Sequence, residues 1–197
     1  MDSRRKLPSG FALWVALSFC SGFALAVWAG EAMLFRNDGD VRINAPDFHF
    51  LEGKSLERAK DGQSVLYVFQ VQLAAGSRQA PASMRIGYKF WLSYDLWEER
   101  FVVTDRRERA TFRSTSEAEA WCLARSPINV TQSLRSQPLW LKLEVWADEN
   151  SVKETAFADS GIDLRTLIDY FSRNPKRSAH WALERGPFQW GDLKQGS

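Results

Sequence analysis

Residues 84–96 read MRIGYKFWLSYDL, and this stretch sets the expected fold class. Large apolar side chains occupy the even-numbered positions from Met84 to Leu96, whereas Arg85, Lys89 and Asp95 are polar. Because successive side chains of a β-strand point to opposite faces, this alternation predicts a strand with one buried face.

The flanking residues extend this strand into a series of hairpins. Glu98 and Glu99 form a predicted turn, after which Arg100 to Thr104 pairs back and Ala110 to Arg113 forms a short strand. Similar alternation predicts half-buried strands at residues 65–73 and 138–146. Further strands are predicted at residues 41–51, interrupted by Pro46, and at residues 179–183.

Two short helices are predicted. Ser114 and Glu117 have the spacing of a capping box, which announces a helix over residues 116–125. A second helix is predicted where Leu164, Leu167, Ile168 and Phe171 repeat at helical spacing.

These elements predict a mainly β protein, namely an immunoglobulin-like antiparallel β-sandwich with two short helices. The alternative is an α+β domain in which the helices back one antiparallel sheet, because the apolar stripe of residues 164–171 must be buried. Cys122 is the only cysteine after residue 30, so this part of the chain has no intrachain disulfide.

The N-terminal region is typical of an export signal. Arg4, Arg5 and Lys6 precede an uncharged stretch that extends to Glu31. We expect residues 1–29 to be a signal peptide or an N-terminal membrane anchor, with membrane contact through residues 7–30. Residues 30–40 are expected to be a spacer, residues 41–190 a single β-rich domain and residues 191–197 a tail.

Charge and location narrow the class of partner. Three of the 26 basic and one of the 24 acidic residues precede residue 30, which leaves 23 of each in the remainder. A neutral domain lacks the basic excess of a nucleic-acid-binding protein, so no nucleic acid is expected. The predicted location is periplasmic or otherwise extracytoplasmic.

The sequence contains no recognisable catalytic or metal-binding motif. His49 and His180 are far apart in sequence and neither has a neighbour at metal-ligand spacing, so we expect no metal, cofactor or catalytic residue. His49 is expected at the edge of the core, His180 at the surface, and Cys122 as a small buried hydrophobe. The basic run from Arg106 to Arg113 is expected to be a solvated turn, with anionic lipid headgroups as the alternative ligand.

Four tryptophans fall on the polar faces of their strands or hairpins: Trp91, Trp97, Trp140 and Trp146. The structural interpretation is a second layer of core, covered by the helices or by the C-terminal segment with Trp181 and Trp190. The functional interpretation is a binding patch, in which tryptophan is a favoured anchor.

The hairpin of residues 92–103, followed by Phe112 and by residues 114–121, resembles an exported bacterial family known as domain of unknown function 4390. The resemblance covers residues 41–190, and the loop of residues 76–83 departs from it by lacking a Trp-containing segment. It implies an exported β-sandwich and assigns no catalytic residue.

These observations lead us to expect an exported, non-catalytic envelope protein that acts as an interaction or scaffold module for another envelope protein. The alternatives are an enzyme without recognisable motifs and a carrier of a lipid or small hydrophobic ligand. The oligomeric state stays open.

Overall fold

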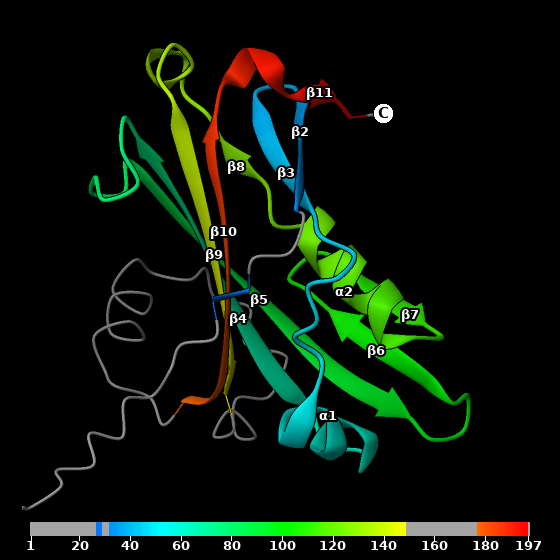
Figure 1. Ribbon diagram of the computed structural model, residues 1–197. Helices are drawn as coiled ribbons and strands as arrows, with labels where there is room; N and C mark the ends of the chain where they lie inside the picture. The colour runs from blue at the N-terminus through cyan, green and yellow to red at the C-terminus, as the bar shows by residue number, and fades with distance from the viewer. Residues whose placement is uncertain (1–26, 29–31, 149–176, 197) are drawn as a thin grey trace, which may run out of the picture.

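The computed structural model describes residues 27–28, 32–148 and 177–196 (Figure 1). This part of the chain is mainly β, with a seven-stranded sheet, a four-stranded sheet and two α-helices. Within the same residues, no helix has the length and apolar character needed to cross a membrane. The predicted class, a β-sandwich with few helices, is confirmed.

The larger sheet has the strand order β1-β10-β9-β4-β5-β6-β7. Only its edge pair β1–β10 is parallel. Its strands are β1 (Val27–Trp28), β4 (Val65–Ala75), β5 (Met84–Asp95), β6 (Arg100–Thr104), β7 (Arg109–Phe112), β9 (Leu139–Asp148) and β10 (Arg177–Phe188).

The smaller sheet has the order β11-β2-β3-β8, in which β11 is parallel to β2. Its strands are β2 (Met33–Asn37), β3 (Asp40–Asn44), β8 (Ile128–Asn129) and β11 (Lys194–Gln195). The helices are α1 (Gly53–Lys60) and α2 (Thr115–Ala124), and short 3-10 turns occupy Gln132–Leu134 and Trp190–Asp192.

Strand β4 is the centre of the larger sheet. It pairs with β5 on one side and with β9 on the other, so that Phe69 lies opposite both Tyr88 and Val145. We call the face that carries the odd-numbered residues of β4 the inner face, and the opposite one the outer face. The alternation predicted a half-buried strand, but residues 65–71 are buried on both faces. The reason is that Leu66 and Val68, on the outer face, are apolar too.

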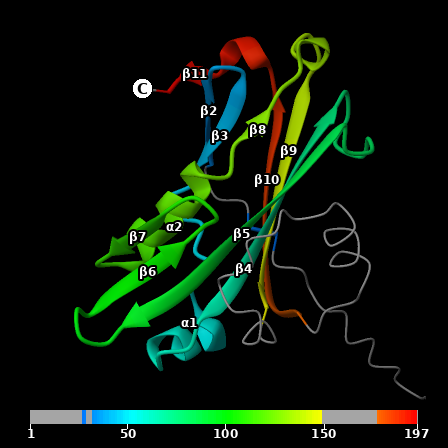
Figure 2. The same cartoon turned by 180° about the vertical axis from the view of Figure 1, so that it is seen from behind.

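The main core lies between the inner face and a second layer. That layer contributes Leu34, Val41 and Ile43 from the smaller sheet and Ala118 and Cys122 from α2. Figures 1 and 2 show the four-stranded sheet at one end of the molecule, α1 at the other, and α2 between them beside β6 and β7. The two sheets and α2 therefore share one core.

One of the two predicted helices is confirmed. In α2 the Ser114 hydroxyl accepts a hydrogen bond from Glu117 N, and the Glu117 carboxylate accepts one from Ser114 N. Helix α1 was not predicted, because only Ser55 and Ala59 of it are fully buried and its N-cap residue, Glu52, makes no side-chain cap. The predicted helix around residues 164–171 lies outside the described residues.

Several expected boundaries differ in the structure. Residues 33–37 of the expected spacer form β2, and residues 194–195 of the expected tail form β11. The strand expected over residues 41–51 ends at Asn44. The turn at Asp38 and Gly39, which have φ values of 44° and 93°, connects β2 to β3 as a tight hairpin and so makes residues 33–37 a strand. β3 ends two residues before Pro46, which has no backbone N–H to donate to a sheet.

Part of the expected leader pairs with the larger sheet. Val27 and Trp28, at the end of residues 1–29, form β1 and pair with Ala182 and Leu183 of β10. Two residues near the end of the predicted leader therefore belong to the larger sheet.

Gly186 is fixed by a close approach inside the β9–β10 pair. A Cβ at this position would lie 2.7 Å from two ring atoms of Trp140 and 2.8 Å from the backbone oxygen of Leu139. No L side chain fits at these distances without a shift of the backbone.

We expect Gly186→Ala to lower the free energy of unfolding by about 1–3 kcal/mol, because Trp140 and the β9 backbone must both move. Gly191→Ala is the matched control, since a Cβ there meets nothing within 4 Å. Denaturant unfolding of the full chain in mild detergent measures both. Equal stability of the two variants would contradict the tight packing of Trp140.

Candidate functional site

The structure does not gather the four polar-face tryptophans into one exposed patch. Trp146 is buried, with 4% exposure, and packs with Leu66 and Val68 into a second apolar cluster on the outer face. Trp91 is partly buried against the same cluster. Trp91 and Trp146 therefore belong to a small second apolar cluster on the outer face.

Of the two expected covers of this outer face, the C-terminal segment packs elsewhere, and the predicted helix at residues 164–171 lies outside the described residues. Trp181 and Trp190 pack against the main core. The Trp181 indole N–H donates to the Glu52 carboxylate at 2.7 Å, and Arg135 lies over the Trp190 ring at 4.4 Å. Trp140 lies six residues along β9 from Trp146, beside Gly186. The two C-terminal tryptophans, Trp181 and Trp190, therefore pack on the inner side of the larger sheet.

Trp97 is the exception, because 97% of its surface is exposed at the tip of the β5–β6 hairpin. Its neighbour Leu96 is 63% exposed. The turn is ordered by Asp95, whose Oδ1 accepts hydrogen bonds from Trp97 N at 2.9 Å and Glu98 N at 3.1 Å. The backbone donors hold the pKa of Asp95 below its usual range, so this turn keeps its acceptor ionised at neutral pH.

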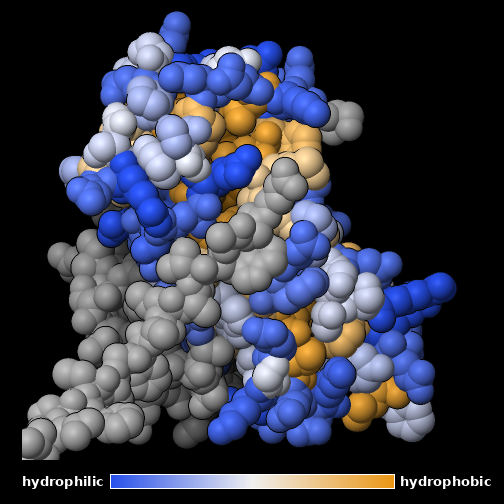
Figure 3. Space-filling model, in the orientation of Figure 1, coloured by the Kyte–Doolittle hydropathy of each residue, from blue (hydrophilic) through white to orange (hydrophobic). Residues whose placement is uncertain are grey.

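Exposed large apolar side chains are few in the described residues. Besides Leu96 and Trp97, only Met33 on β2 is in this class, with 47% exposure. Figure 3 shows hydrophobic surface over β2 and β3 and smaller hydrophobic patches in the lower right part of that face, with hydrophilic surface around them. We call Leu96 and Trp97 together the hairpin tip.

A second feature is a surface pocket of about 510 Å³ at the edge of β5. Strand β6 pairs only with residues 91–95 of β5, so within the described part of the chain the earlier part of this edge has no strand neighbour. The pocket is lined from β3, β5, the β6–β7 turn and the C-terminal end of α2, by Arg42, Gly87, Tyr88, Lys89, Phe90, Asp105, Arg106, Arg107, Ala124, Arg125 and Pro127.

The lining carries five cationic side chains and one carboxylate. The carboxylate, Asp105, is fully engaged: its Oδ2 accepts from Arg125 Nε at 2.8 Å, and its Oδ1 accepts from the backbone N–H groups of Arg107 and Glu108 at 2.7 Å each. Burial opposes ionisation of Asp105, but these hydrogen bonds outweigh it and lower its pKa. Arg125 also pairs with Glu108 at 2.7 Å and stacks over the Trp121 ring.

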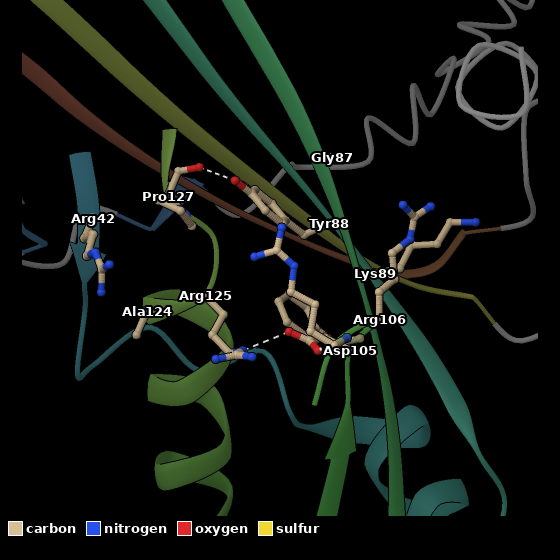
Figure 4. A pocket seen from close by; sticks show the side chains of 11 residues that line it. Arg42, Gly87, Tyr88, Lys89, Asp105, Arg106, Ala124, Arg125 and Pro127 are labelled. Atoms are coloured by element: carbon tan, nitrogen blue, oxygen red, sulfur yellow. Dashed lines mark hydrogen bonds and ion pairs between the residues drawn. The ribbon is translucent and has the colours of Figure 1, made fainter. Parts of the chain in front are cut away.

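The remaining cations approach the pocket from opposite sides. In Figure 4, Arg42 extends from β3 on one side, Lys89 and Arg106 lie on the other, and Tyr88 and Arg125 lie between them. The Tyr88 hydroxyl donates to the Pro127 carbonyl, and burial raises the pKa of Tyr88 to about 12. Tyr88 is therefore a neutral, fixed wall of a strongly cationic pocket.

A third feature pairs His49 with a carboxylate that sequence reasoning missed. Glu119 of α2 is buried, and its Oε1 accepts from Phe50 N and Leu51 N at 2.7 Å each. Its Oε2 lies 2.9 Å from His49 Nδ1, and this hydrogen bond raises the pKa of the imidazole. Only its position on α2 beside Ala118 and Cys122 could have indicated that Glu119 faces inward.

The other titratable residues fall as follows. Cys122 is buried, as predicted, and burial raises the pKa of its thiol. His180 was expected at the surface, but its side chain is only 18% exposed because the ring stacks on Trp146 at 5.5 Å. Among the described residues, no group of three or more histidines, cysteines or acidic residues is placed to hold a metal ion.

We expect Glu119→Ala to destabilise the fold by about 1–3 kcal/mol for each buried N–H that loses its acceptor, namely those of Phe50 and Leu51. Glu119→Gln keeps an amide oxygen for the same two donors and serves as the matched control. Thermal unfolding followed by near-UV circular dichroism compares the two. A Gln variant as unstable as the Ala variant would show that the charge, and not the acceptor geometry, carries the effect.

The comparisons with known proteins give no relative: no family model, no curated protein and no solved structure matches this chain. The resemblance to domain of unknown function 4390 therefore stays a prediction.

Proposed function

We propose that this chain is an exported, non-catalytic protein-interaction module of the cell envelope, and that the hairpin tip is its contact with a protein partner. The single observation that carries the proposal is the 97% exposure of Trp97 on an ordered turn. A tryptophan held in water without a packing role adds nothing to folding, whereas burial of its ring area favours association.

The order of the turn also supports a binding role. Asp95 holds the Trp97 and Glu98 backbone by two hydrogen bonds, and Glu99 takes a φ of 53° that completes the reversal. A preordered anchor loses less conformational entropy on binding than a flexible one. Tryptophans of this kind are frequent among the residues that contribute most to interface affinity.

The charges around the tip favour a protein over a membrane surface. Glu98 and Glu99 directly follow Trp97, and both are exposed. Anionic lipid headgroups would repel these carboxylates, whereas a protein pocket with an apolar floor and basic rim would complement the whole tip. We therefore commit to a protein partner with that surface.

The two alternatives have less support. Within the described residues, the hydrogen-bond partners of the Glu119 carboxylate are His49, Phe50 and Leu51, so the His49–Glu119 pair holds that segment onto α2. The cationic lining of the pocket does not suit a purely hydrophobic ligand. Loss of an activity on His49→Ala, with folding retained, would favour the enzyme.

We expect Trp97→Ala to weaken binding of the envelope partner by roughly 30-fold or more, as for a central interface anchor. Partner capture by crosslinking of the tagged full chain in the envelope, followed by mass spectrometry and titration of the identified partner, measures this. The free energy of unfolding should change by less than about 0.5 kcal/mol, because the side chain packs against little.

Met33→Ala is the matched control, since it removes the other exposed large apolar side chain, far from the tip in the strand order. Equal partner recovery from wild type, Trp97→Ala and Met33→Ala would refute the hairpin tip as the contact.

Export is tested separately. We expect alkaline phosphatase fused after residue 197 to be active, and the N-terminus of the mature chain to be either Met1, for an anchor, or Val27, for a cleaved leader. Cleavage after Ala26 retains β1, whereas cleavage after Ala29 removes Val27 and Trp28 from the sheet. An inactive fusion would contradict the extracytoplasmic location.

A further inference from the structure

The cationic pocket has more positive charge than its own carboxylate can balance. Asp105 is occupied by Arg125 and by two backbone N–H groups, and Arg125 is shared with Glu108. Arg42, Arg106 and Arg107 line the same pocket, and within the described residues none of them forms an ion pair with a carboxylate. Concentrating like charges in a concavity raises the local potential and attracts anions.

We propose that this pocket binds the phosphate group of a small organic phosphate, with the guanidinium groups of Arg42, Arg106 and Arg107 as its ligands. Guanidinium groups donate paired hydrogen bonds whose geometry matches phosphate oxygens. Several of them around one pocket match a multiply charged anion better than a single carboxylate, which would leave most of the positive charge unbalanced.

The remaining walls fit the organic part of such a ligand. Tyr88, Phe90, Ala124 and Pro127 supply apolar surface, and the volume of about 510 Å³ lies within the usual range for small-molecule sites. Tyr88 is held in place by its hydrogen bond to Pro127. The Asp105–Arg125 pair fixes the β6–β7 turn on α2, so that Arg106 and Arg107 are presented from an ordered segment.

The C-terminal end of helix α2 opposes binding of an anion in the pocket. Helix α2 ends at the pocket, and the C-terminal end of a helix carries partial negative charge. Arg125 is the C-cap residue of α2 and therefore offsets this charge where the helix meets the pocket.

The pocket is separate from the hairpin tip, which lies beyond the C-terminal end of β5.

The test is isothermal titration calorimetry of the full chain in a non-ionic detergent and phosphate-free buffer. The ligands are sodium pyrophosphate and glycerol 3-phosphate, with sodium chloride at equal ionic strength as the blank. We expect saturable binding of both phosphates that weakens by about tenfold or more in Arg42→Gln and in Arg107→Gln. Binding should also weaken as sodium chloride is raised, because salt screens the attraction.

Arg113→Gln is the matched control, because it removes one exposed charge from the same basic run without touching the pocket. Arg113→Gln should bind both phosphates as the wild type does. Trp97→Ala should also bind both phosphates normally, even though it is expected to lose the protein partner, so the two proposals are tested separately. No binding by the wild-type chain, or equal weakening in Arg113→Gln and Arg42→Gln, would overturn the proposal.

The source of the phosphate is separated by competition. Displacement of pyrophosphate by mixed micelles containing phosphatidylglycerol, and not by those containing phosphatidylcholine, would assign the site to an anionic lipid headgroup. Failure of either micelle to displace pyrophosphate would assign it to a free phosphate ester. Both results support a phosphate site.

Discussion

The structure depends on the two-sided pairing of β4. Its residues 65–73 pair with β5 and its residues 66–75 with β9, so this one strand fixes the register of both neighbours. A shift by a single residue would move Tyr67, Phe69 and Val71 from the core to the outer face. Burial of these side chains and of their neighbours on β5 and β9 therefore determines how the rest of the larger sheet is assembled.

Glu119 connects the second layer to this sheet. The Glu119 carboxylate accepts hydrogen bonds from the backbone N–H groups of Phe50 and Leu51. These two residues lie between β3 and α1 and belong to no strand. Buried backbone donors need an acceptor, and a carboxylate is a strong one. Phe50 is thereby held against Phe69, with the ring centroids 5.0 Å apart, and α2 is fixed across the core.

The two proposed sites use different physical forces and lie on different parts of β5. The hairpin tip at the end of β5 offers apolar area to a partner, whereas the pocket beside the middle of β5 offers positive charge. Each site depends on a turn in which an aspartate side chain accepts hydrogen bonds from backbone N–H groups of the turn. The aspartate is Asp95 at the hairpin tip and Asp105 at the pocket. The same local device therefore presents an aromatic anchor in one turn and arginines in the next.

The sequence by itself determined what depends on local periodicity: the strands β4, β5, β6 and β9, the capped start of α2 and the mainly β class, because alternation and capping are written in adjacent residues. Tertiary structure alone decided what depends on partners distant along the chain. Glu119 meets His49 across 70 positions, and Arg42 joins Arg106 at one pocket. Trp97 and Trp146 had the same polar-face signal, yet one is exposed and the other buried, because strand neighbours decide which side chains are covered.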